Sequence, residues 1–458
     1  MTRPSVLLYE PRHRSARLPL SLLHVASSLD ARVAIVDGRL EMAPAALVAE
    51  LAREALCLGV TTPTGPPLAD ALEVTRAARA ARPKLPVLWG GPHATFRPAE
   101  CLATGLVDAC VQGPGERTLA EIVAALRAGG TETGIPGVAW LRGLELAESL
   151  PRPREDVNHL PQVDYALIDL ERHFRFRGAR RAEVSTSRGS SAGADWSGLL
   201  AERVLALVED LARRHKVDDV VFTDQGFFVD PARVLAIASG LLAAGVVVGW
   251  EASASLLDLV AARGRFDWRL LRESGCHRVR LFAEGAGGPG LAEEVAALAE
   301  GGLAVHVTFI VGRPGEPAAA AREAYNAARG LQHLGGSVTV ELRLFEPWPG
   351  CDDSGVALTE GRAAPPVDLA GWSAFEPERL SSAWTSSSVR RSVPRWSFYL
   401  GRASARPGRR LAQRLVRRLA RARVRLGFYG LDLDRRAVLG LHRLKEAFTL
   451  RAPLPVED

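Results

Sequence analysis

Short runs of apolar, often β-branched residues alternate with longer segments of helical periodicity over residues 5–141. The apolar runs occupy residues 5–9, 31–38, 55–62, 86–91, 109–113 and 137–141. Residues 67–82 and 117–128 lie between such runs and repeat apolar side chains at three- and four-residue spacing, as crossover helices do. This alternation predicts an α/β fold with a doubly wound parallel sheet.

Loops rich in small residues follow three of the predicted strands, at 61–65, 90–95 and 113–116. In a doubly wound sheet, ligands bind at the carboxyl ends of the strands, where these loops are expected. The loops therefore indicate a broad, flat or phosphate-bearing ligand. The alternative is that the small residues only form tight turns between strand and helix.

A second series of strand and helix patterns begins after an irregular segment, residues 150–182, that is rich in Pro, Arg and Asp. Its predicted strands are 182–186, 219–223, 246–251, 278–282, 304–310 and 338–344, with helices such as 199–215 and 230–244 between them. Six such units predict a partial βα barrel rather than a complete eightfold barrel. Beyond residue 350 the composition changes, first to a Ser-, Pro- and Trp-rich stretch and then to an arginine-rich helix at about 407–426.

The composition is that of a soluble globular protein with two or three domains: 458 residues, 47% of them hydrophobic and 24% charged. Arginine supplies nearly all of the positive charge, because lysine occurs only at Lys84, Lys216 and Lys445. The most apolar stretch, residues 234–250, is shorter than the roughly 20 residues of a membrane span and predicts a buried helix followed by a buried strand. The N-terminus is expected to form a first strand and not a signal peptide.

The cysteines are spread widely along the chain. Cys57, Cys101, Cys110, Cys276 and Cys351 are too far apart to form a CxxC or CxxxCxxC ligand set. Their odd number argues against a secreted disulfide framework. We therefore expect a cytoplasmic protein.

Several short motifs follow one another in an order that is known from one protein family. The loops WGGPHAT at 89–95 and GPGE at 113–116 resemble that family's GGxHxT and GxGE loops. Residues 156–165 resemble its linker, and residues 222–227, 273–276 with 282–285, and 309–316 resemble motifs of its later barrel strands. Over residues 1 to about 350, the chain resembles the cobalamin (B12)-binding radical S-adenosylmethionine (SAM) family.

The resemblance implies an α/β chain with four segments. Residues 1–150 would form a Rossmann-like B12-binding domain and residues 151–181 a linker. Residues 182–350 would form a radical-SAM-like partial (β/α) barrel, and residues 351–458 a variable, arginine-rich helical C-terminal tail.

The chain departs from the family at the motif that holds its iron–sulfur cluster. The residues STSRG at 185–189 are intact, but the three positions of the CxxxCxxC ligands are Ser190, Ala194 and Ser197. Iron–sulfur clusters require thiolates. Alanine has no ligand atom, and a serine hydroxyl has a far higher pKa than a thiol. We therefore predict that a [4Fe-4S] cluster is absent and that S-adenosylmethionine is not cleaved by the usual radical route.

The resemblance also implies two sets of cofactor-binding residues, while catalytic residues stay unassigned. The set for cobalamin is Thr62, Thr64, Gly90, Gly91, His93, Thr95, Gly113, Gly115 and Glu116. The set for S-adenosylmethionine is Asp224, Glu284, Gly312 and Glu316, unless these are only features of the fold. His93 is expected to shape its loop and not to bind cobalt, because the DxHxxG pattern that supplies an axial histidine in other proteins is absent. The axial ligand of cobalt is left open.

Three functions compatible with these motifs remain. The leading prediction is a cluster-less, radical-SAM-like cobalamin-binding protein, either a pseudoenzyme or an accessory partner of an enzyme in a biosynthetic pathway. The alternative is a cobalamin-dependent methyltransferase that uses S-adenosylmethionine by two-electron chemistry. A third is a docking module without a corrinoid. The sequence leaves open which of these holds, and also the substrate and the oligomeric state.

The arginine-rich helix at about 407–426 could place a basic face on an anionic membrane or on nucleic acid. The commoner arrangement is a helix that packs through its leucines and leaves a solvated basic face. We expect that arrangement and no nucleic-acid partner, because no nucleic-acid fold accompanies the helix. Peripheral contact with a membrane is left open.

Overall fold

The computed structural model describes residues 6–189, 196–350, 365–375, 383–404, 411–430 and 432–440. Contacts along the chain divide it into two compact units. The first unit combines Met1–His277 with Glu346–Ala383, and the second combines Arg278–Phe345 with Trp384–Asp458. The division into a B12-binding domain, a linker, a partial barrel and a C-terminal tail therefore stays a prediction.

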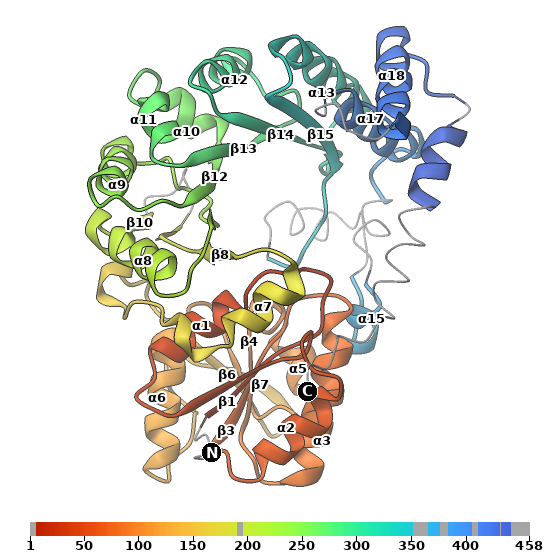
Figure 1. The fold of residues 1–458 in the computed structure, drawn as a ribbon. Coiled ribbons are helices and arrows are strands. Elements are labelled where there is room, and N and C mark those ends of the chain that lie inside the picture. Colours follow the sequence, from red (N-terminus) through yellow and green to blue (C-terminus); the bar gives the residue numbers. More distant parts are fainter. Residues whose placement is uncertain are drawn as a thin grey trace. The chain divides into compact units, whose positions relative to one another are not determined.

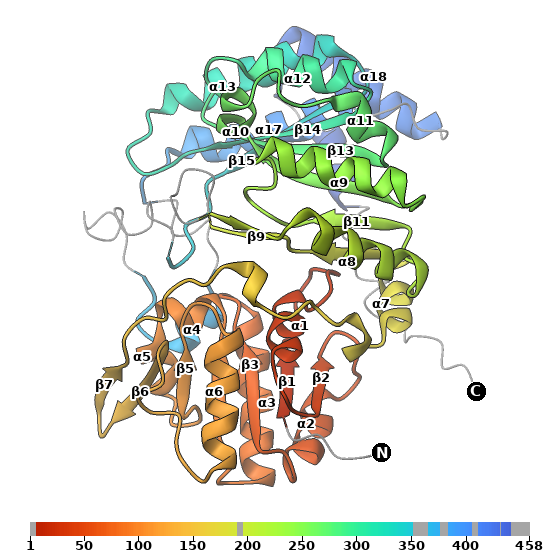
Figure 2. The same cartoon turned by 90° about the vertical axis from the view of Figure 1, so that its left-hand side faces the viewer.

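A seven-stranded sheet, with the order β2-β1-β3-β4-β5-β6-β7, forms the centre of the N-terminal part of the first unit. Its strands are β1 (Val6–Glu10), β2 (Val33–Asp37), β3 (Cys57–Thr61), β4 (Val87–Gly90), β5 (Ala109–Val111), β6 (Val138–Arg142) and β7 (Glu145–Glu148). The helices of this part are α1 (Leu20–Ser27), α2 (Pro44–Ala52), α3 (Pro67–Ala81), α4 (Pro92–Phe96), α5 (Pro98–Leu102) and α6 (Glu116–Arg127). Figure 1 shows α1 and α6 on one face of the sheet and α2 and α3 on the other, and Figure 2 views the same sheet from the side that α6 covers.

Successive side chains of β1 point to opposite faces of the sheet, and both faces are covered by helices. This explains why the sequence of β1 is a continuous apolar run. Leu7 and Tyr9 belong to the core under α2 and α3, whereas Val6 and Leu8 belong to the core under α1 and α6. A strand that is covered on both faces needs apolar residues at successive positions, as parallel strands of α/β proteins do. The sequence pattern therefore located β1 to β6 correctly.

The predicted sheet is parallel only as far as β5. β6 pairs with β5 in the antiparallel direction, and β7 then pairs with β6 as a hairpin. The short connection between β6 and β7 passes through Gly143, which has a φ of +67°, and it permits this hairpin, whereas a parallel strand would need a crossover. The prediction of a wholly parallel sheet was wrong here, and β7 was not foreseen because its sequence ELAE is polar.

The segment 150–182, predicted to be irregular, contains a well-capped helix. The helix α7 (Leu170–Arg177) starts at Asp169, whose side chain accepts a hydrogen bond from the backbone N–H of Arg172. It ends at Gly178 in the left-handed conformation that commonly terminates helices. Two 3₁₀ turns, η1 (Val157–His159) and η2 (Tyr165–Leu167), precede it.

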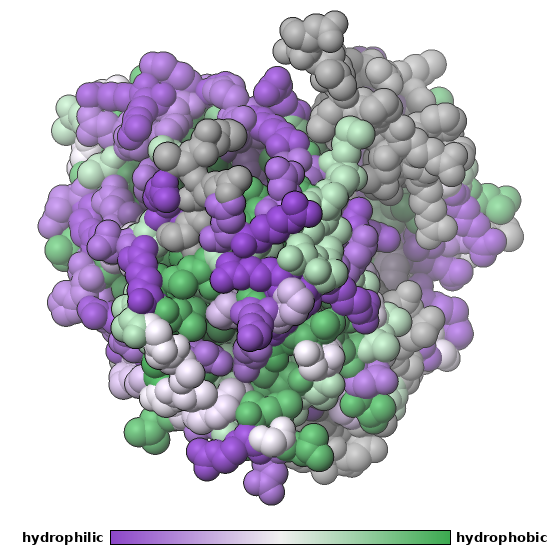
Figure 3. Space-filling model, turned by 90° about the horizontal axis from the view of Figure 1, so that it is seen from below, coloured by the Kyte–Doolittle hydropathy of each residue, from purple (hydrophilic) through white to green (hydrophobic). Residues whose placement is uncertain are grey.

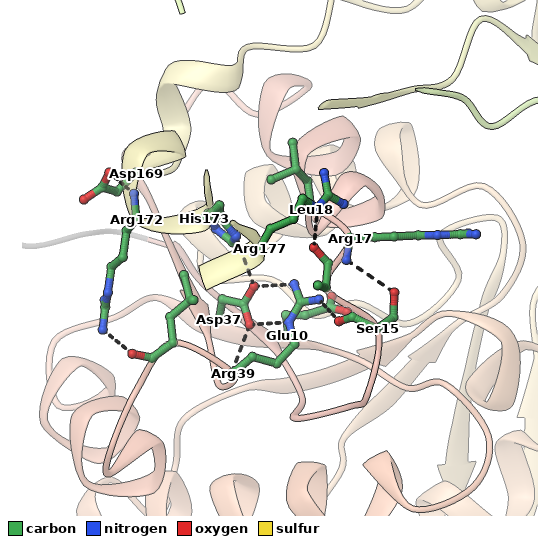
Figure 4. Close-up of polar contacts among 12 residues, drawn as sticks. Glu10, Ser15, Arg17, Leu18, Asp37, Arg39, Asp169, Arg172, His173 and Arg177 are labelled. Carbon is green, nitrogen blue, oxygen red and sulfur yellow. Dashed lines mark hydrogen bonds and ion pairs between the residues drawn. The ribbon is translucent and has the colours of Figure 1, made fainter. Parts of the chain in front are cut away.

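Figure 4 shows how α7 attaches to the first strands of the sheet. Arg172 donates to the carbonyl oxygen of Leu40, as drawn, and also to the carboxylate of Glu41 (2.6 Å). Arg177 donates to the carbonyl oxygen of Ala16 (3.1 Å). His173 lies 3.8 Å from Asp37 at the end of β2, and burial lowers the pKa of His173 to about 4. These contacts fix the linker on the carboxyl end of the sheet.

The remaining part of the first unit is a parallel ladder of three strands, β8 (Arg181–Val184), β11 (Asp219–Phe222) and β12 (Gly249–Ser255). Helices α8 (Ala201–Arg213), α9 (Pro231–Ala243), α10 (Leu256–Ala261) and α11 (Trp268–Glu273) connect or follow these strands, and β9 (Ser187–Arg188) pairs with β10 (Ser197–Gly198) as a short antiparallel ribbon. α9 and β12 confirm the predicted helix and strand around residues 234–250.

The second unit contains the parallel strands β13 (Cys276–Glu284, of which the first two residues belong to the first unit), β14 (Ala304–Val311) and β15 (Val338–Leu344). Its helices include α12 (Leu291–Glu300), α13 (Ala318–Gly330), η3 (Leu331–Leu334), α17 (Ser387–Ser404) and α18 (Leu411–Leu426). α18 is the predicted arginine-rich helix, but the leucines whose burial is described do not form the packed face. Leu415 and Leu419 are 51% and 49% exposed, whereas Ala420 and Val424 are buried.

A return segment of the chain, residues 365–375, completes the core of the first unit. It contains α15 (Leu369–Ser373), and Leu369, Trp372 and Phe375 join the core cluster under α3. Within the described residues, no helix is long and apolar enough to cross a membrane. The surface in Figure 3 intersperses hydrophilic and hydrophobic side chains.

Candidate functional site

A cavity of about 460 Å³ lies in the first unit at the carboxyl ends of the parallel strands. One wall is the sheet, through Leu8, Leu88 and Val111, and the opposite wall comes from α1 and α6, through Val25 and Leu119. The predicted residues Gly90, Gly91, Gly113, Gly115 and Glu116 also line it. The structure thus brings five of the nine predicted cobalamin residues to one cavity.

The two glycines that matter most here act in different ways. Gly91 has a φ of +91°, and a Cβ at this position would lie 2.9 Å from Oγ1 of Thr61, so the turn itself requires glycine. Gly115 has an ordinary φ of −91°. A Cβ at Gly115 would lie 3.3 Å from Cγ2 of Val25, so a larger side chain at this position would extend into the cavity.

The other four predicted cobalamin residues support the loops around the cavity and do not line it. The hydroxyl of Thr62 donates to the carbonyl oxygen of Gly90 (2.7 Å), and Oγ1 of Thr64 lies 3.2 Å from Nδ1 of His93. His93 is fully buried and lies edge-on to the ring of Trp372, at 5.4 Å between ring centroids. Thr95 accepts a hydrogen bond from the backbone N–H of Gly113 (3.1 Å).

The position of His93 agrees with the predicted loop-shaping role. Burial, and then the charge of Arg97, lower the pKa of His93 to about 4, so the imidazole is neutral at pH 7. Its role stays a prediction, as do those of the other predicted site residues.

Two residues that line the cavity, Arg188 and Glu116, form an ion pair that the sequence did not reveal. Arg188, in β9, donates through both terminal nitrogens to the carboxylate of Glu116 at the start of α6. Glu116 is only 5% exposed. The pair neutralises a buried carboxylate, and it joins the N-terminal sheet to the STSRG segment. Arg188 was visible as part of that motif, but nothing in the sequence connected it to Glu116.

His24 is a second cavity residue that the sequence did not reveal. It lies in α1 within the apolar sequence LSLLHVAS, which is typical of a core helix. Its Nε2 atom is buried and has no hydrogen-bond partner among the described residues. Burial lowers its pKa to about 4; the charge of Glu116 acts in the opposite direction, and that of Arg188 in the same direction.

Asp224 lies under the turn between β8 and β9. Its carboxylate accepts hydrogen bonds from the backbone N–H groups of Thr186 (2.6 Å) and Ser187 (2.8 Å), and from the hydroxyl of Thr186 (2.6 Å). Arg233 donates to the carbonyl oxygen of Thr186 (3.0 Å). Burial raises the pKa of Asp224, although these hydrogen bonds and the charge of Arg233 oppose the increase.

The three remaining residues predicted for S-adenosylmethionine lie in the second unit. Glu284, at the end of β13, forms an ion pair with Arg313 (2.7 Å). Glu316 accepts hydrogen bonds from the backbone N–H groups of Gly312 and Arg313. The carbonyl oxygen of Gly312 accepts from the indole N–H of Trp384 (3.0 Å). Each of these groups therefore already has a partner within the chain.

The donor groups do not fit an iron–sulfur cluster. Ser190 and Ala194 lie outside the described residues. The hydroxyl of Ser197 donates to Asp156 (2.9 Å) and accepts from the backbone N–H of Val157 (3.2 Å). The cysteines in the described part of the chain are buried, and burial raises the pKa of Cys57 to about 12. Cys351 is outside the described residues. No set of three or more His, Cys, Asp or Glu within the described ranges could hold a metal ion.

The cavity, in contrast, fits part of a corrinoid. Glycines allow close approach of a ligand to the backbone, apolar walls can enclose a flat aromatic group, and a buried nitrogen lacks a partner.

Comparison with known proteins agrees with this fit. Residues 18–123 match the family described as B12 binding domain. An uncharacterized methyltransferase of Pyrococcus horikoshii is 28% identical over 291 residues, which are 58% of this chain and 61% of the relative. The 2-(S-pantetheinyl)-carbapenam-3-carboxylate methyltransferase of Streptantibioticus cattleyicolor is 32% identical over 199 residues, 39% of this chain and 28% of the relative. The chain thus spans less than two thirds of these curated relatives.

Solved structures show the same fold. The radical S-adenosylmethionine methyltransferase TsrM from Kitasatospora setae, with tryptophan and a SAM analogue bound, has a TM-score of 0.64 at 18% identity, over 79% of this chain and 77% of its own. The cobalamin-dependent S-adenosylmethionine radical enzyme OxsB, with aqua-cobalamin and S-adenosylmethionine bound, has a TM-score of 0.62 at 16% identity, over 75% and 53%.

These matches confirm the predicted B12-binding domain and the α/β fold of cobalamin-dependent radical SAM enzymes. The domain supports cobalamin as the ligand, and the relatives include named methyltransferases.

Proposed function

We propose that this chain is a cluster-less, radical-SAM-like cobalamin-binding protein that serves as an accessory partner of an enzyme in a biosynthetic pathway. The observation that carries the proposal is a contrast between the cavity, which suits cobalamin, and the cluster positions, which lack cysteine. The cavity beside Gly91 and Gly115 has the space and the walls for part of a corrinoid, whereas the cluster positions Ser190, Ala194 and Ser197 carry no thiolate. Cobalamin, when bound, would supply a cobalt centre that can carry a methyl group.

The contacts of the predicted S-adenosylmethionine residues support an accessory role. In the family that the chain resembles, the cluster is expected to anchor the methionine end of S-adenosylmethionine. A single hydrogen bond to a charged group contributes about 1.5–3 kcal/mol, so the loss of such an anchor weakens binding severely. The carboxylates of Asp224 and Glu316 already accept backbone hydrogen bonds, and they offer little replacement. Glu284 forms an exposed ion pair with Arg313.

A methyltransferase that works by two-electron chemistry is the second candidate, because relatives of the chain are named methyltransferases. Such an enzyme would need S-adenosylmethionine bound close to cobalt.

Two titrations of the purified full chain separate these functions. Hydroxocobalamin, followed by visible absorbance, is expected to bind at one per chain. S-adenosylmethionine, followed by calorimetry, is expected to show no micromolar binding, and mass spectrometry is expected to find neither methylcobalamin after reduction of the cobalt nor 5′-deoxyadenosine. Micromolar binding together with methylcobalamin would establish the methyltransferase. Failure to retain hydroxocobalamin would favour a docking module. The accessory role further predicts co-purification with an enzyme of the same pathway.

A further inference from the structure

His24 lies at the boundary between two cavities of the first unit. One is the cavity of about 460 Å³ described above, and the other, of about 30 Å³, lies toward the linker residues Leu160 and Val163. His24, Ser185 and Arg188 line both cavities. They therefore form a polar boundary at one side of a cavity whose other walls are mainly apolar.

The Nε2 atom of His24 is buried and has no hydrogen-bond partner among the described residues. A buried polar atom without a hydrogen bond is destabilising, and folded proteins contain few of them. The charged groups that face His24 are Glu116 of α6 and Arg188 of β9. These two groups are already bonded to each other, so neither completes the hydrogen bonding of the imidazole.

The shape of the cavity indicates which part of a corrinoid would meet His24. A cavity of about 460 Å³ is in the range that encloses a drug-sized group, and a whole corrinoid is much larger. The flat, apolar part of cobalamin is the base at the end of its nucleotide tail, which suits the space between Leu8, Leu88 and Leu119. The ribose and phosphate that follow the base are polar, and they suit the boundary formed by His24, Ser185 and Arg188.

We propose that His24 is a specificity residue that recognises the nucleotide tail of the corrinoid, through a hydrogen bond between its ring nitrogen Nε2 and a ribose or phosphate oxygen. The inference rests on the proposed cobalamin binding. It goes further, because it assigns to this chain a preference for complete corrinoids over corrinoids that lack the nucleotide. His24 positions the cofactor and takes no part in chemistry at cobalt.

The experiment compares two probes on the full chain: hydroxocobalamin, and diaquacobinamide, which is a corrinoid without the nucleotide tail. Dissociation constants are measured by equilibrium dialysis with absorbance detection. In His24→Leu, the affinity for hydroxocobalamin is expected to fall about tenfold, while the affinity for diaquacobinamide stays the same. His24→Phe keeps an aromatic ring without nitrogen and should behave like His24→Leu. His24→Gln restores an amide N–H near the position of Nε2 and should recover most of the loss.

His173→Leu is the matched control, because the pKa of His173 is lowered to about 4, as that of His24 is, but His173 lies in α7, outside the cavity. It should change neither dissociation constant. Circular dichroism confirms that each variant is folded, and His24→Phe replaces His24→Leu if the latter unfolds.

Three outcomes would overturn the inference. Unchanged binding of both probes by the His24 variants would mean that only water satisfies Nε2. An equal loss for both probes would assign His24 to the corrin ring or to the fold. If the parent chain binds neither probe, the proposed function itself fails. In the first two outcomes the parent chain still binds both probes, so only the role of His24 fails.

Discussion

The cavity beside β4 and the turn after β8 both follow the carboxyl ends of parallel strands in the first unit. They differ in whether their polar atoms already have hydrogen-bond partners within the chain. In the cavity, Gly115 leaves space and His24 leaves a nitrogen without a partner. In the turn, the carboxylate of Asp224 is bonded by Thr186 and Ser187 of the same chain. A retained motif can therefore have a purely structural role, whereas open space and unpaired polar atoms indicate a ligand.

The largest expected effect concerns the turn, because cluster binding is all or none. Anaerobic reconstitution of the full chain with iron and sulfide should yield no [4Fe-4S] cluster, since Ser190, Ala194 and Ser197 offer no thiolate. Iron and sulfide analysis together with the visible spectrum check this. About four irons per chain with a thiolate charge-transfer band would contradict the prediction, and would require an unexpected ligand such as Cys276 or Cys351.

A triple variant, Ser190→Cys with Ala194→Cys and Ser197→Cys, provides the matched control. It restores the CxxxCxxC spacing and should acquire iron under the same conditions. Iron uptake by this variant would show that the three substituted positions alone prevent cluster binding in the parent chain.

The next effect tests whether Asp224 is structural. Asp224→Ala leaves the N–H groups of Thr186 and Ser187 without their acceptor and removes the negative charge near Arg233. Removing one partner from such a buried charged network typically costs about 3–5 kcal/mol. Urea unfolding followed by circular dichroism measures the loss. Asp30→Ala, at an exposed position, should change stability by less than about 0.5 kcal/mol. Equal stability of Asp224→Ala and the parent would show that this carboxylate is available to a ligand.

The smallest expected effect tests the cavity. Gly115→Leu should reduce the affinity for hydroxocobalamin at least tenfold, or about 1.4 kcal/mol, because the new side chain would occupy space next to Val25. The backbone at Gly115 has a negative φ, so the substitution should not strain the turn. Gly91→Leu is less informative, because its positive φ would disturb the fold itself.

Gly336→Leu serves as the control for this test, since a Cβ at Gly336 meets open space in the second unit. Absorbance titration measures all the variants. A folded Gly115→Leu protein that binds hydroxocobalamin as tightly as the parent would place the ligand elsewhere.

The sequence predicted those elements whose own pattern determines them. β1 and β3 are buried on both faces, so their apolar runs were sufficient. Loops such as 113–116 could be located because glycine and proline mark turns. The direction of β6 could not be predicted, since the connection from β5 contains the helix α6, as a parallel crossover would, and β6 still pairs with β5 in the antiparallel direction. α7 was missed because its sequence LERHFRFR is mostly polar and depends on capping and on contacts with distant residues.

The candidate site was predictable only in part. Gly90, Gly91, Gly113, Gly115 and Glu116 belong to recognisable loops and do line one cavity. His24 was not recognised, because a histidine in an apolar helix has the same pattern whether or not its nitrogen has a partner. The pairing of Arg188 with Glu116 and the contact of Trp372 with His93 depend on how distant segments meet, which periodicity does not encode.

The return of residues 346–383 to the first unit has a consequence for the order of synthesis. Trp372 and Phe375 complete a core whose other members, such as Leu68 and Trp89, are made far earlier. A ribosome must therefore translate β13, β14 and β15 before the first unit can close its core. Until then the nascent chain displays an apolar surface at α3, the kind of surface that chaperones bind.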